Sequence, residues 1–179
     1  MKSFIGVIVI LSCIACSKSD ETKTEAAAIA TSETPAPISL TAADFDGFVK
    51  GMTHEIALVK DAHHRATTAT SPQERGNAIQ SAFEENTMAA AVPVSGLSLE
   101  RYRLVRQTLS RILVTLDFQE KIDGPQSVDT TLADSAMKVR LKSDPYSALD
   151  AASTAELKAR LSQIAPVWIE YANITAVNG

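Results

Sequence analysis

The chain has 179 residues, of which 45% are hydrophobic, 21% charged and 5% aromatic, and its formal net charge is −4. This length suits one compact domain with tails, and the low content of glycine and proline, seven of each, favours helix over sheet. The negative charge supplies no overall basic field, so we expect no nucleic-acid partner.

The first residues have the character of an export signal. Lys2 carries one positive charge, and the run "FIGVIVIL" at 4–11 is apolar and uncharged. Extended through Ala15, this run is too short for a bilayer-spanning helix, which needs about 20 residues, but typical of the apolar core of a secretory signal peptide. The alternative is a buried first element of the domain, and the polar tract that follows argues against it.

Both cysteines lie at the end of this run, in "LSCIACSKSD" at 11–20. The stretch resembles the lipobox of bacterial lipoproteins, in which a cysteine is lipidated and becomes the first mature residue. The resemblance implies a signal peptide over 1–15 and lipidation of Cys16, with Cys13 as the alternative. Because Ser17 rather than aspartate follows, it also implies an outer-membrane anchor that faces the periplasm. A redox pair or disulfide is the other alternative, and it would need a thioredoxin-like setting.

Residues 16–40 are rich in Ser, Thr, Ala, Glu and Pro. They contain too little apolar surface to offset the entropy of ordering, so we interpret them as the lipidated cysteine and a flexible tether. The domain is then expected over 41–179.

The domain is predicted to begin with a helix capped by Thr41, with Asp44 completing a capping box. This helix should run to about residue 69. Its apolar residues recur at spacings of three and four and share one face: Phe45, Phe48, Met52, Ile56 and Val59.

A second capping box, "SPQE" at 71–74, predicts a helix that ends near residue 91, before Pro93 and Gly96. A third helix is predicted from the cap Ser98 to "DGP" at 123–125. Its expected core residues are Tyr102, Val105, Leu109, Ile112 and Leu116, and Leu97 and Tyr102 are placed as a hydrophobic staple.

A fourth helix is predicted over about 129–141, followed by a turn or short helix from "DP" at 144–145 to about 151. The capping box "STAE" at 153–156 predicts a last helix, in which Pro166 should cause a kink or break. The predicted fold is therefore all-α: an antiparallel helical bundle of about four main helices plus a short one.

Four arginines crowd the third predicted helix: Arg101, Arg103, Arg106 and Arg111. Arg103 and Arg106 lie three residues apart and are predicted to share a face, which could bind phosphate or carboxylate groups of a partner. The alternative is a solvated row that pairs with acids of neighbouring helices, such as Glu84, Glu85 or Asp117.

A weaker set, His54, Asp61 and His64, lies along the first helix at spacings that share a face. A metal site there would need further ligands, and we expect neither a metal nor another cofactor. No nucleophile elbow or phosphate-binding loop is present in the sequence, so the protein is not expected to be an enzyme.

Together these features predict a lipid-anchored periplasmic envelope protein that binds a partner protein or an envelope component. An immunity or inhibitor lipoprotein that neutralises an envelope-acting toxin or hydrolase is an alternative. An envelope hydrolase or a metal-handling protein is a third.

Overall fold

The computed structural model describes residues 36–125 and 135–176. The predicted signal peptide, both cysteines and most of the predicted tether lie outside the described residues. Within these ranges every regular element is a helix, which confirms the predicted all-α class. The helices are α1 (Ala42–Thr68), α2 (Pro72–Ser81), α3 (Glu84–Ser95), α4 (Leu99–Phe118), α5 (Ser135–Lys142) and α6 (Ala151–Ala176).

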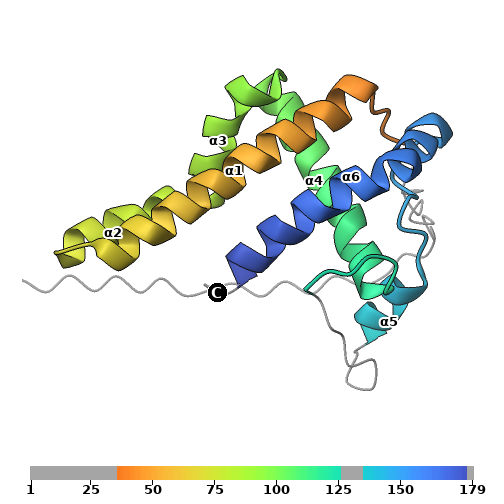
Figure 1. Ribbon diagram of the computed structural model, residues 1–179. Coiled ribbons are helices and arrows are strands. Elements are labelled where there is room, and N and C mark those ends of the chain that lie inside the picture. Colours follow the sequence, from red (N-terminus) through yellow and green to blue (C-terminus); the bar gives the residue numbers. More distant parts are fainter. Residues whose placement is uncertain (1–35, 126–134, 177–179) are drawn as a thin grey trace, which may run out of the picture. The chain divides into compact units, whose positions relative to one another are not determined.

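Helix α1 lies at the centre of the domain and contacts α2, α3, α4 and α6 (Figure 1). Helices α2 and α3 run back along α1 in the opposite direction, as in the predicted antiparallel bundle. Helix α6 instead runs parallel to α1, since Leu40 bonds to Ser153 at one end and Lys60 pairs with Glu170 farther along. The long connection between α4 and α6 allows this by returning the chain to the start of α1.

The core lies where α1, α4 and α6 cross. The apolar faces predicted for α1 and α4 are confirmed, because each of their ten residues is buried. They exclude water together with apolar residues of α6, whose burial stabilises the fold in proportion to the apolar area removed from water: Leu157, Ile164, Ala165 and Trp168.

Local capping signals were predicted correctly at three helix starts. Thr41 and Asp44 form a reciprocal capping box, as do Ser71 and Glu74. The Ser98 hydroxyl accepts a hydrogen bond from the Arg101 backbone N–H at 3.2 Å. Each cap satisfies backbone N–H groups that have no partner within the helix.

The single helix predicted from residue 72 to about 91 is wrong. The chain leaves helical geometry at Phe83, whose φ of −64° and ψ of 142° are extended, and this separates α2 from α3. The Asn86 side-chain amide donates to the Gln80 carbonyl at 2.8 Å and so satisfies an end carbonyl of α2. Helix α3 then continues past Pro93 to Ser95, where Gly96 takes the left-handed conformation (φ 73°).

The predicted cap of the last helix is wrong, and the break predicted as one outcome at Pro166 does not occur. It begins at Ala151, capped by Asp150, which accepts a hydrogen bond from the Ser153 backbone N–H at 2.7 Å. Ser153 is therefore not the cap, and its buried hydroxyl bonds to Leu40 instead. Helix α6 also continues through Pro166 to Ala176 without a break. The segment at 143–150 forms turns rather than a short helix.

The end of the predicted tether is part of the domain. Ile38 forms an isolated parallel bridge with Leu149, and Leu40 is buried in the core. The boundary predicted at residue 41 is therefore too late, because the Ile38 backbone pairs with the segment before α6 and the Leu40 side chain packs in the core.

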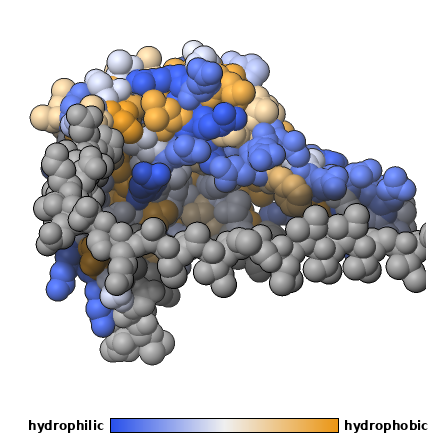
Figure 2. Space-filling view, turned by 180° about the vertical axis from the view of Figure 1, so that it is seen from behind, coloured by the Kyte–Doolittle hydropathy of each residue, from blue (hydrophilic) through white to orange (hydrophobic). Residues whose placement is uncertain are grey.

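The C-terminal half of α1 and helix α2 form an arm that projects from the core (Figure 1). On the face shown in Figure 2, the side chains over this arm are mainly hydrophilic. None of the helices in the described ranges is long and apolar enough to cross a lipid bilayer.

Candidate functional site

The four arginines of α4 do not form one surface. Arg103 and Arg111 are exposed, Arg101 is partly buried, and Arg106 is buried. The predicted exposed face shared by Arg103 and Arg106 is therefore wrong. Helical periodicity explains this: Arg106 lies four residues after buried Tyr102 and three before buried Leu109, so it projects from the core side of α4.

Arg106 lies at the centre of a buried ion network. Its Nε and Nη2 donate to the two carboxylate oxygens of Glu55 at 2.9 and 3.0 Å, a bidentate pair. Nη1 donates to Glu84 at 2.8 Å, and Nη2 also donates to the Tyr171 hydroxyl at 2.8 Å. Glu55 accepts two further hydrogen bonds, from Tyr102 at 2.7 Å and from Thr87 at 3.2 Å.

The network joins α1, α3, α4 and α6. The side chains of Glu55 and Arg106 are 0% and 5% exposed, so both charges are removed from water and depend on each other. Burial acts to lower the pKa of Arg106, but the charge and hydrogen bonds of Glu55 outweigh it and raise that pKa above its usual range. Burial and the Glu55 charge likewise raise the pKa of Tyr102, which keeps its proton and donates.

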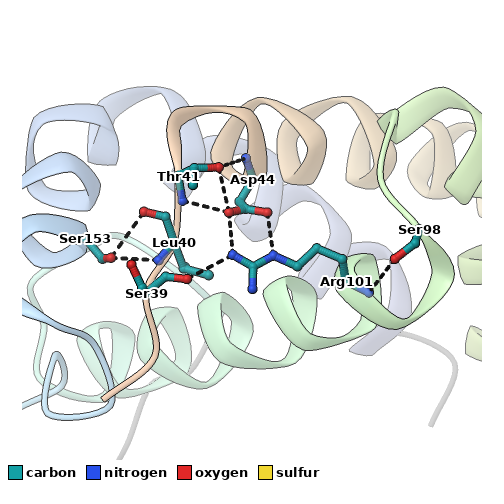
Figure 3. Close-up of polar contacts among 7 residues, drawn as sticks. All are labelled: Ser39, Leu40, Thr41, Asp44, Ser98, Arg101 and Ser153. Carbon is teal, nitrogen blue, oxygen red and sulfur yellow. Dashed lines mark hydrogen bonds and ion pairs between the residues drawn. The ribbon is translucent and has the colours of Figure 1, made fainter. Parts of the chain in front are cut away.

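Arg101, another of the four arginines predicted to contact a partner, stabilises the junction at which α1 begins (Figure 3). Its guanidinium donates to both carboxylate oxygens of Asp44, at 2.7 and 2.6 Å, and to the Ser39 carbonyl at 2.9 Å. The hydrogen bond from Arg101 is the largest cause that lowers the pKa of Asp44, to about 2. Arg101 thus connects α4 to the segment that precedes α1.

Ser153 of α6 completes this junction. Its hydroxyl accepts from the Leu40 backbone N–H at 2.7 Å and donates to the Leu40 carbonyl at 3.2 Å (Figure 3). The chain that enters the domain is therefore bonded to α4 and α6 before α1 begins.

A groove of about 540 Å³ lies on the arm. The floor comes from α1, one wall from the end of α2 and the start of α3, and the other wall from the C-terminal part of α6. Its size is that of small-ligand and side-chain binding sites, and most of its lining is apolar. The lining residues are Val59, His63, Ala66, Thr67, Ile79, Ala82, Phe83, Glu84, Tyr171 and Thr175.

Two large apolar side chains of this lining are open to solvent. Phe83 is 56% exposed and Ile79 is 48% exposed. Glu84 and Tyr171 belong both to the groove and to the Arg106 network, so the buried ion pair fixes one end of the groove. Exposed apolar groups beside fixed polar groups are typical of a binding surface.

The weak metal candidate is not assembled. Asp61 accepts from Arg65 at 2.7 Å, and His64 is exposed on the arm. His54 lies seven residues before Asp61, about 10 Å along the helix axis. No group of three or more metal-binding side chains occurs within 36–125 and 135–176.

No family model, no curated protein and no solved structure matches the chain.

Sequence reasoning missed the two residues that define the site, Glu55 and Phe83. Glu55 lies between Met52 and Val59 in helical spacing, within the apolar face of α1, and a charge at such a position is a sign of a buried pair. Phe83 carried no comparable local sign, because its exposure follows from the break between α2 and α3.

Proposed function

We propose that this protein is a lipid-anchored protein of the bacterial cell envelope that acts by binding a partner, and that the groove on the arm is its binding site. The anchor rests on the lipobox-like sequence that ends at Cys16. The observation that supports binding is the groove itself, where Phe83 and Ile79 expose apolar surface near the buried Glu55–Arg106 ion pair.

The described titratable residues favour binding over catalysis. Glu55 and Arg106 are the most deeply buried charges near the groove, and each is held by several hydrogen bonds. A general acid or base must reach the proton that it transfers, whereas Glu55 is 0% exposed behind Tyr102 and Thr87. The network therefore serves to hold four helices in place.

The position of the groove suits an anchored binder. The chain enters the domain at the start of α1, while the groove floor begins at Val59, about 25 Å farther along the helix axis. The docked residues Ile38 and Leu40 fix the point of entry. The groove consequently lies near the C-terminal end of α1, whereas the described chain enters the domain at the N-terminal end.

The anchor is tested by mass spectrometry of the mature protein from the membrane fraction. We expect an N-terminal Cys16 that carries acyl chains, which together anchor stably where one chain alone would be marginal. Cys16→Ser should abolish the modification and Cys13→Ser should not. A mature chain in which both cysteines are present and unmodified would contradict the anchor.

Binding is tested by pull-down from envelope extract with the full-length protein. Phe83→Ser should lose the captured partner, because serine removes the ring but suits the N-cap position of α3, which Phe83 occupies. Leu104→Ser, which changes a partly exposed apolar residue outside the groove, is the matched control. Arg103→Glu tests the exposed arginine of α4, and loss of binding in this variant alone would move the site from the groove to α4.

A further inference from the structure

The groove lies on α1 between helix α6 and the α2–α3 pair. Helix α6 and the α2–α3 pair each pack extensively on α1, but α6 shares no extensive contact with α2 or α3 in the part of the chain that the structure describes. The surface of α1 between them is only partly covered at His63 and Ala66 and is exposed at Thr67, and the buried side chain of Val59 lies at the bottom of the groove. A fourth helix laid in this gap would complete a local four-helix arrangement.

The floor of the groove suits a closely packed helix. Val59, His63 and Ala66 follow one another at spacings of four and three, so they form one stripe of α1. Ala66 on the floor and Ala82 on the wall are small, which allows close approach of another helix. Phe83 and Ile79 can then pack against the sides of that helix and lose their contact with water.

The charges around the groove are biased toward acid. Lys60 pairs with Glu170, and Arg65 pairs with Asp61. The network of Glu55, Arg106 and Glu84 contains two carboxylates for one guanidinium, and Glu84 is 59% exposed at the groove.

Glu85 follows on the exposed surface of α3, and exposed Glu74 and Arg75 offset each other on α2. Glu84 lines the groove and exposed Glu85 is its neighbour in the chain, so the net charge at the end of the groove near α3 is negative and would attract a cationic side chain.

On the basis of the proposed function, we infer that the groove binds an amphipathic helix of a partner protein, with its apolar face on α1 and its lysine or arginine side chains beside Glu84 and Glu85. The apolar face supplies the affinity and the charges set the orientation. The helix would be recognised by apolar residues at spacings of three and four.

The probe is a fluorescent synthetic helix of about 14 residues, or about 21 Å, with leucines along one face and lysines beside them. A matched peptide has glutamate in place of every lysine. Binding is measured by fluorescence anisotropy to the full-length protein in lipid discs of phosphatidylcholine, and empty discs give the background. The lysine peptide should bind saturably, and the glutamate peptide at least about tenfold more weakly.

Variants of the protein locate the binding. Phe83→Ser should lower the affinity for the lysine peptide by about tenfold. Glu85→Lys should lower that affinity by about threefold. Leu104→Ser should leave affinity unchanged. Circular dichroism of each variant checks that the helices remain intact.

Several results would overturn the inference. They are no binding of the lysine peptide, equal binding of both peptides, or an affinity of the Phe83→Ser variant for the lysine peptide equal to that of the unchanged protein. Binding of a fluorescent long-chain fatty acid, lost in Phe83→Ser and not displaced by the peptide, would assign the groove to a small apolar ligand instead. If Cys16 is acylated and the pull-down depends on Phe83 while the peptide fails, the proposed function stands and only the helical, basic nature of the partner is rejected.

Discussion

Replacing Glu55 by leucine would remove the buried carboxylate that pairs with Arg106 at the centre of the ion network. Arg106 would keep one anionic partner, Glu84, and would lose the bidentate pair while still buried. Breaking a buried pair in this way typically costs about 3–5 kcal/mol, because the remaining charge is uncompensated. Since domains of this size are stable by about 5–15 kcal/mol, the variant should lose a large fraction of its folding free energy.

A double-mutant cycle separates the pair from its surroundings. The free energy of unfolding is measured by urea titration with circular dichroism for Glu55→Leu, Arg106→Met and the double variant. The double variant should lose less than the sum of the two single variants, because neither charge remains buried alone. Arg103→Met, on the exposed side of the same helix, should change stability by no more than about 0.5 kcal/mol. A loss below about 1 kcal/mol in Glu55→Leu, or additive losses in the cycle, would refute this account of the network.

The pKa of Asp44, lowered to about 2 by its hydrogen bond from Arg101, predicts a pH dependence of stability. Because the folded pKa lies below the unfolded value, the contribution of about 2 kcal/mol is present above pH 4 and lost as the pH falls toward 2. Asp44→Asn should remove this pH-dependent contribution. If the urea midpoints of the unchanged protein and of Asp44→Asn fall by the same amount from pH 6 to pH 2, the contribution of Asp44 is contradicted. Gly51→Ala should destabilise the protein by about 1–3 kcal/mol, because a Cβ atom there overlaps the Tyr102 ring. Gly76→Ala, in open space on α2, should instead stabilise it by about 0.5–1 kcal/mol in the same titration; equal effects of the two changes would contradict the close approach of α1 and α4.

The parts of the fold that depend on neighbouring residues were predictable from the sequence. The capping boxes at Thr41 and Ser71 are built from residues three apart, so the sequence contains all of their atoms. The apolar stripes of α1 and α4 are equally local, since helical spacing alone places Phe48 and Leu109 on buried faces. The all-α class was predictable because capping boxes and apolar stripes of this kind recur along the chain.

The features that depend on distant residues were not predictable in the same way. Arg106 was assigned to the surface because charged residues are rarely buried, and its burial depends on Glu55, which is 51 residues away. The break at Phe83 contains neither glycine nor proline. The break places Thr87 where it can bond to Glu55, and Glu84 where it can bond to Arg106. These tertiary contacts favour the break, and the helix propensities of the local residues do not predict it.

Ser153 shows the same limit at the other end of the domain. Its sequence, "STAE", has the form of a capping box, yet Asp150 caps α6 and Ser153 bonds to Leu40, 113 residues away. The side chain that the pattern assigns to a cap is used to dock the entering chain. Pro166 was overestimated as a helix breaker because the packing of Ile164, Ala165 and Trp168 on the core stabilises α6 on both sides of it.

The central claim, an anchored protein that binds through the groove, is tested most directly by photo-crosslinking in intact cells. A photoreactive phenylalanine is placed at position 83 of the full-length protein, and at position 104 as the control. The account predicts a crosslink from position 83 alone, to a partner segment with apolar residues at helical spacing and a net positive charge. No crosslink from position 83, or equal crosslinks from both positions, would contradict it.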